Sequence, residues 1–144
     1  MRALLDVNML VALHDARHMH HELAVEWLDA HSVQGWATCP MTQNGCLRVL
    51  SQPAYPNPRP IHLLLDALGA SFTSQQHEFW PDDISLLDSR RFRRDRVQGH
   101  RQITDLYLLA LAVHRKGRMV TLDARMATSV VVGADANSLL TLLA

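Results

Sequence analysis

Short apolar runs and amphipathic stretches alternate along this chain of 144 residues. Residues 3–5 form an apolar run without a helical stripe, which predicts a buried strand typical of a parallel sheet. Residues 35–39, 77–80, 118–123 and 129–132 are further short segments that predict strands. Residues 137–144 form a closing apolar segment.

The segments between these runs show helical patterns. Residues 9–13 predict a short helix, and residues 18–31 carry apolar positions at the spacing of an amphipathic helix. A helix is expected to begin at Pro40. Residues 61–69 predict another helix, which is expected to end at Gly69. Residues 81–83 are expected to cap another short helix. Residues 103–117 are apolar almost all round, which predicts a buried helix. This alternation predicts an α/β fold with a mainly parallel sheet.

Composition is that of a soluble globular protein, with 48% hydrophobic and 19% charged residues. We expect one domain spanning residues 1–144. No apolar stretch is long enough to cross a membrane, and Asp6 and Asn8 interrupt any secretion-signal pattern, so a cytoplasmic location is expected. The spacing of Cys39 and Cys46 on one helix argues against a disulfide, so both are expected to be reduced and packed.

The formal net charge is zero, which argues against a simple polyanion-binding module. Basic residues are nevertheless clustered, with Arg90, Arg91, Arg93, Arg94 and Arg96 within seven positions. Such a cluster can form a phosphate-binding surface. It can equally be a solvated loop or helix end.

Three aspartates follow or begin the buried elements. Asp6 ends the first strand, Asp123 ends residues 118–123, and Asp105 lies near the start of the buried helix. The carboxyl ends of neighbouring parallel strands share one edge, where ligands bind in α/β sheets. Asn8 would point to the same side as Asp6 if the chain stayed extended. The alternative for Asp6 is that it only caps the following helix.

Converging carboxylates need a counter-charge, and oxygen ligands favour Mg²⁺ or Mn²⁺. Such an ion beside a nucleic-acid backbone is suited to phosphodiester hydrolysis. Four histidines, His14, His18, His20 and His21, offer a second metal-like cluster. Their spacing favours solvent-facing side chains at a helix start over a zinc site.

Four motifs occur in a characteristic order. They are Leu-Leu-Asp6-Val-Asn8, Thr42-x-Asn44-Gly45-x-x-Arg48, Ile103-Thr-Asp105 and Val120-Thr-Leu-Asp123. Together they resemble the PIN domain over essentially the whole chain, and more narrowly the VapC toxins of bacterial VapBC toxin–antitoxin pairs. The resemblance implies a three-layer α/β/α sandwich that cleaves RNA with Mg²⁺ or Mn²⁺. It also implies a homodimer and a small VapB-like antitoxin that covers the active site.

The resemblance also assigns roles to individual residues. Asp6 and Asp105 match the most diagnostic metal-binding acids, and Asp123 matches a further acid. Polar residues that match neighbours of the site are Asn8, Thr42, Asn44 and Thr104. Contacts to RNA or antitoxin are expected from Arg48, Arg90, Arg91, Arg93 and Arg94.

The chain departs from the family pattern at Gln43, where relatives usually carry glutamate. Losing one carboxylate there would weaken metal binding, which keeps open a non-catalytic PIN domain that only binds RNA or antitoxin. A haloacid-dehalogenase-type phosphatase also begins with a strand that ends in aspartate. That family needs Asp-x-Asp, whereas this chain has Asn8 at the second acid.

Overall fold

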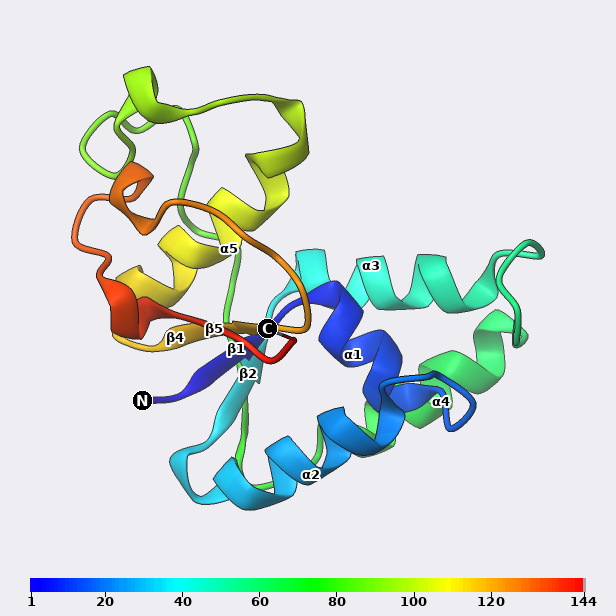
Figure 1. Cartoon of the computed structure of the whole chain (residues 1–144). Coiled ribbons are helices and arrows are strands. Elements are labelled where there is room, and N and C mark those ends of the chain that lie inside the picture. The colour runs from blue at the N-terminus through cyan, green and yellow to red at the C-terminus, as the bar shows by residue number, and fades with distance from the viewer. Residues whose placement is uncertain (144) are drawn as a thin grey trace.

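A parallel sheet of five strands forms the centre of the computed structural model, which describes residues 1–143 (Figure 1). The strand order is β3-β2-β1-β4-β5, and every neighbouring pair is parallel. The strands are β1 (Ala3–Leu5), β2 (Trp36–Thr38), β3 (His77–Phe79), β4 (Arg118–Thr121) and β5 (Leu139–Thr141). The expected α/β class with a parallel sheet is confirmed.

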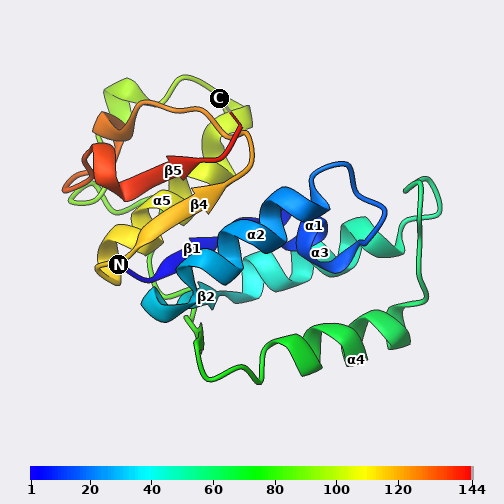
Figure 2. The ribbon, with the colours of Figure 1, turned by 60° about the horizontal axis from the view of Figure 1, so that its bottom comes forward.

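Helices cover both faces of the sheet. They are α1 (Val7–His14), α2 (His21–His31), α3 (Pro40–Ser51), α4 (Ile61–Ser71) and α5 (Ile103–His114). Figures 1 and 2 show α5 on one side of the sheet and α1 to α4 on the other. Short 3₁₀ turns occupy several connections, among them Arg94–Arg96 and Thr128–Val130.

The alternation of side chains along β1 divides the core into two. Leu4 packs in the cluster on the α5 side, whereas Ala3 and Leu5 pack in the cluster on the α1 side. Both faces of the strand are therefore apolar, as expected for a central strand. The result is the three-layer α/β/α sandwich that the resemblance implied.

One strand prediction near the C-terminus needs correction. Residues 129–132 form no ladder strand; Val130 ends a 3₁₀ turn, and Val131 makes one isolated antiparallel bridge to Phe92. Both valines are buried, so their apolar character reflects packing rather than strand pairing. The last strand is instead β5, which lies within the closing segment.

Two helix predictions also need correction, and the condition stated for Asn8 is not met. No helix follows Pro81, because residues 80–91 form loops and turns. Gly69 does not end α4, which continues to Ser71. The chain is not extended at Asn8, which lies in the first turn of α1.

The expected state of the two cysteines is confirmed. Cys39 and Cys46 are buried free thiols, and burial raises the pKa of each to about 11 and about 12, respectively. Within residues 1–143, no helix has the length and apolar character needed to span a membrane.

Candidate active site

Asp6 lies where β1 ends and α1 begins. Its Oδ1 accepts a hydrogen bond of 2.9 Å from the backbone N–H of Met9, which caps α1. Its Oδ2 accepts a hydrogen bond from the hydroxyl of Thr121, the last residue of β4. These two bonds hold a carboxylate that is only 4% exposed at the carboxyl edge of the two central strands.

The three aspartates lie within electrostatic range of one another. Burial raises the pKa of Asp6 to about 6, and the negative charges of Asp105 and Asp123 add to that rise. Burial and Asp123 likewise raise the pKa of Asp105, which is half-buried in the first turn of α5. Because α5 runs antiparallel to the strands, its first turn reaches the same edge. The structure therefore brings the three carboxylates into one negatively charged region.

Asp123 completes this region from an exposed position two residues beyond β4. Its Oδ1 accepts a hydrogen bond of 3.3 Å from the side-chain amide of Asn8. Asn8 thus reaches the site from the first turn of α1 and not from an extended segment.

The donor chemistry of this region fits a hard divalent cation. The available ligands are carboxylate oxygens, and their mutual repulsion calls for a positive counter-charge. In the part of the chain that the structure describes, no three histidine, cysteine, aspartate or glutamate side chains are grouped closely enough to hold a metal ion as they stand.

A pocket of about 620 Å³, called here the α3 pocket, opens beside the carboxylates. Two of its lining residues are chain neighbours of the acids: Val7 directly follows Asp6, and Thr104 directly precedes Asp105. The complete lining is Val7, Pro40, Met41, Asn44, Gly45, Arg48, Asp82 and Thr104. The pocket therefore brings together Asn44, Arg48 and Thr104, three residues that the sequence pattern assigned to the site.

Thr42 and Gln43, which precede Asn44 on α3, do not line this pocket. Thr42 is fully buried, and its hydroxyl exchanges hydrogen bonds with the backbone of Cys39 at the start of the helix. Thr42 therefore stabilises the start of α3.

Gln43 donates a hydrogen bond of 3.0 Å to Thr38 Oγ1, which also contacts His77. Ala37 packs on the α5 side of the sheet, so the next residue, Thr38, points to the α1 side. Asp6 follows Leu5, which packs on the α1 side, so Asp6 points to the α5 side, where it meets Thr121. The expectation that Gln43 stands at the metal site is wrong.

Asp82 is a site residue that the sequence pattern did not reveal. Its Oδ1 accepts a hydrogen bond of 2.8 Å from the Tyr107 hydroxyl, and its Oδ2 accepts one of 3.0 Å from the backbone N–H of Met41. Asp82 thus ties α5 to the first turn of α3 and lines the α3 pocket. Its sequence signal, a Pro-Asp-Asp run, indicated a helix cap, but the helix that it caps is α3 rather than a following one.

Comparison with known proteins agrees with this geometry. The family model described as the PIN domain matches residues 3–129. The chain belongs to the PIN domain family. The similarity continues in curated relatives from Mycobacterium tuberculosis strain H37Rv: Ribonuclease VapC44 is 47% identical, covering 99% of this chain and 100% of that protein. Ribonuclease VapC39 is 42% identical, covering 92% of this chain and 96% of that protein.

A solved structure has the same fold. It is the crystal structure of Mycobacterium tuberculosis VapC20, a sarcin-ricin loop cleaving toxin. The TM-score is 0.58 at 14% identity, with 85% of this chain and 89% of that chain covered. The PIN-like fold and the resemblance to VapC proteins are thereby confirmed.

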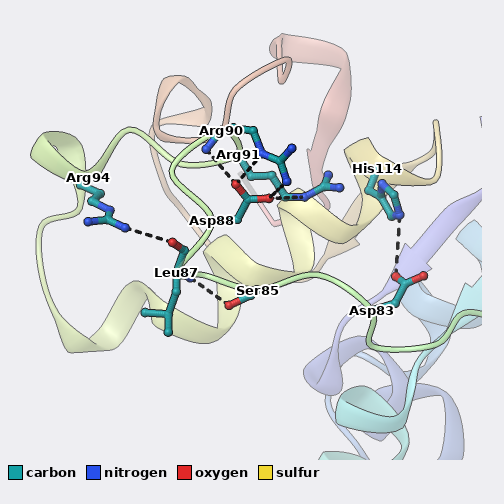
Figure 3. Close-up of polar contacts among 8 residues, drawn as sticks. All are labelled: Asp83, Ser85, Leu87, Asp88, Arg90, Arg91, Arg94 and His114. Atoms are coloured by element: carbon teal, nitrogen blue, oxygen red, sulfur yellow. Dashed lines mark hydrogen bonds and ion pairs between the residues drawn. The ribbon is translucent and has the colours of Figure 1, made fainter.

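The arginine-rich segment of this PIN domain is held by contacts within the chain (Figure 3). Arg90 and Arg91 both pair with Asp88, at 3.1 and 3.5 Å, and Arg94 donates to the carbonyl of Leu87. Arg93 donates to the carbonyl of Ser129. Part of the basic charge therefore stabilises this loop.

The histidine cluster is structural in this PIN domain. His14 and His21 are half-buried, and each uses Nδ1 on a backbone carbonyl, of Leu10 at 2.8 Å and of Ala12 at 2.7 Å. The expectation that these two histidines face solvent was wrong. Within residues 1–143 no zinc-type ligand group is formed.

Proposed function

We propose that this PIN domain is a metal-dependent endoribonuclease that acts as the toxin of a toxin–antitoxin pair. The observation that carries the proposal is the group of three electrostatically coupled carboxylates at the carboxyl edge of β1 and β4. Similarity to Ribonuclease VapC44 over nearly the whole of both chains supports the same activity.

Asp6, Asp105 and Asp123 would hold Mg²⁺ or Mn²⁺. When bound, such an ion activates water and neutralises negative charge that develops on the phosphate oxygens. The protein's own contribution is to orient the ligands. Thr121 and the Met9 N–H fix the Asp6 carboxylate, while Asn8 holds Asp123.

Arg48 is the cation best placed to contact the RNA backbone. It is exposed at the α3 pocket, and its guanidinium has no ion-pair partner within residues 1–143. Arg90, Arg91 and Arg94 already have partners, so they could add only long-range attraction or a second contact. We assign the direct phosphate or antitoxin contact to Arg48.

The non-catalytic alternative rested on Gln43. Since Gln43 faces Thr38 on the other side of the sheet, its amide does not remove a charge from the carboxylate group. No other feature of the described residues favours loss of catalysis over cleavage.

The test is incubation of purified protein with total bacterial RNA in Mg²⁺ or Mn²⁺. Discrete cleavage products are expected, and EDTA should abolish them. Co-expression with the product of an adjacent short reading frame should restore growth that expression of this protein arrests. Intact RNA in millimolar Mn²⁺ would contradict the proposal.

A further inference from the structure

The α3 pocket has the size and the surroundings of a nucleotide-binding site. Its volume of about 620 Å³ is within the range of small-molecule pockets. It adjoins the carboxylates through Val7 and Thr104, so a group bound here would be attached to RNA at or next to the reacting phosphate.

The two sides of the pocket differ in chemistry. Val7, Pro40 and Met41 supply half-buried apolar surface that suits the face of a base. Asn44 and Asp82 supply exposed hydrogen-bonding groups, and Arg48 supplies a positive charge. An apolar wall with a few polar groups is the usual arrangement for recognising a flat heteroaromatic ring.

The two carboxylate oxygens of Asp82 are hydrogen-bond acceptors that contacts within the chain hold in place. Each of its carboxylate oxygens accepts one hydrogen bond within the chain, from Tyr107 or from the Met41 N–H. Because a carboxylate oxygen has two lone pairs, acceptor positions remain on Asp82, with the buried Cys39 thiol as the other group of the chain near them. The two bonds anchor the carboxylate, and Asp82 is an exposed residue of the pocket lining, so a ligand with two adjacent N–H donors can reach it.

We propose that the α3 pocket binds one unpaired guanine nucleotide of the RNA substrate, with Asp82 accepting from the guanine N1–H and 2-amino groups. Guanine is the RNA base that presents two adjacent donors on this edge. Adenine and cytosine pair one amino donor with a ring acceptor, and uracil flanks its single N–H with carbonyl oxygens. Asn44 and Arg48 bind the remaining polar edge and the phosphate. This inference rests on the proposed ribonuclease function and specifies the substrate base for it.

The test measures binding without cleavage, in an Asp105→Asn background. Short fluorescent oligouridine strands carry one guanosine, inosine, adenosine or cytidine, or only uridine, and their dissociation constants are measured in Mg²⁺. The guanosine strand should bind about tenfold or more tightly than the uridine strand, the scale of one bidentate base contact. Inosine, which lacks the 2-amino group, should fall between them.

Adding Asp82→Asn should remove the preference for guanosine. Asp83→Asn is the matched control and should leave the preference intact, because Asp83 lies outside the pocket lining and pairs with Arg115. Asp83 also pairs with His114 (Figure 3). Asn44→Ala is a second probe that does not depend on the Asp82 contacts with α3 and α5. It should weaken guanosine binding several-fold with an unchanged melting temperature.

Equal affinity for guanosine and uridine strands, or a preference that survives both Asp82→Asn and Asn44→Ala, would overturn the inference. So would absence of binding to every strand. If the protein cuts RNA but shows no preference for guanosine, the assignment of guanine to the pocket is wrong and the proposed ribonuclease function stands. Failure of the wild type to cut any RNA counts against the function itself.

Discussion

At the scale of single residues, Asp6 shows how one side chain meets two structural demands. The sequence left open whether it caps a helix or belongs to a site, and it does both: one oxygen caps α1 while the other meets Thr121 beside two further acids. Capping determines where the carboxylate lies, and the crowding of charge determines what it can bind.

The direction of Gln43 leads to the first prediction. Gln43→Glu should leave the Mg²⁺ concentration for half-maximal cleavage unchanged, because the side chain faces Thr38 and His77. Burial lowers the pKa of His77, and a new carboxylate nearby should raise it. NMR titration of the His77 ring and cleavage assays across Mg²⁺ concentrations check the two parts. A lower Mg²⁺ requirement would place position 43 at the metal after all.

Asp15 carries the second prediction. Burial would raise the pKa of its carboxyl, but hydrogen bonds from Tyr55, Asn57 and the Arg17 N–H outweigh burial and hold the pKa below its usual value. Asp15→Ala leaves these donors unpaired, so it should lower the free energy of unfolding at pH 7 by about 2–3 kcal/mol.

The pH dependence of this effect has a definite sign. A lowered native pKa means that the contribution of Asp15 is present above about pH 4 and is lost as the pH falls through the native pKa. Urea titrations of both proteins should therefore converge in acid. Asp29→Ala, at an exposed position of α2, is the control and should change stability by less than about 0.5 kcal/mol. A difference independent of pH would contradict the assignment.

At the scale of elements, α3 is placed by its close approach to α1. A Cβ at Gly45 would lie 2.5 Å from Val7 Cγ2, so only glycine allows this packing. Gly45→Ala should lower the free energy of unfolding by about 1–3 kcal/mol, since Val7 must shift. Gly69→Ala, in α4 with no atom near the added Cβ, should stabilise by up to about 1 kcal/mol. Thermal unfolding checks the pair, and equal effects would contradict the packing account.

Elements with strong patterns could be predicted from the sequence. Residues 3–5 and the apolar helix α5 have buried surfaces on all sides, so their composition alone indicates their environment. The last strand could not be located, because Val130 and Val131 are as apolar as a strand while β5 is only partly buried. Local hydrophobicity reports burial, whereas pairing depends on neighbours distant in the chain.

The same limit applies to the candidate site. The acids at strand ends could be predicted, because parallel strands bring their carboxyl ends to one edge. The role of Asp82 could not, since it depends on contacts with Met41 and Tyr107, which lie 41 and 25 positions away. Helix spacing also places Asn44 about 100° from Gln43, but only the packing of Gly45 on Val7 shows which of them faces the pocket.

At the scale of the whole molecule, we expect a homodimer, as the resemblance to VapC toxins implies. Three apolar side chains of α4, those of Ile61, Leu63 and Leu65, are each at least 50% exposed, so the single chain leaves apolar surface that association could bury. Light scattering after size-exclusion chromatography should give twice the mass of the chain. A monomer at concentrations of about 50 µM would contradict this expectation.

The measurement that tests the central claim most directly is calorimetric titration of Mn²⁺ into the wild type and four single variants, Asp6→Asn, Asp105→Asn, Asp123→Asn and Asp83→Asn. If the three aspartates form one metal site, the wild type and Asp83→Asn should bind Mn²⁺ alike, because Asp83 pairs with Arg115 instead. Asp6→Asn and Asp105→Asn should bind at least about tenfold more weakly, and Asp123→Asn should also be weakened. Equal Mn²⁺ affinity in the wild type, Asp6→Asn and Asp105→Asn would contradict the account.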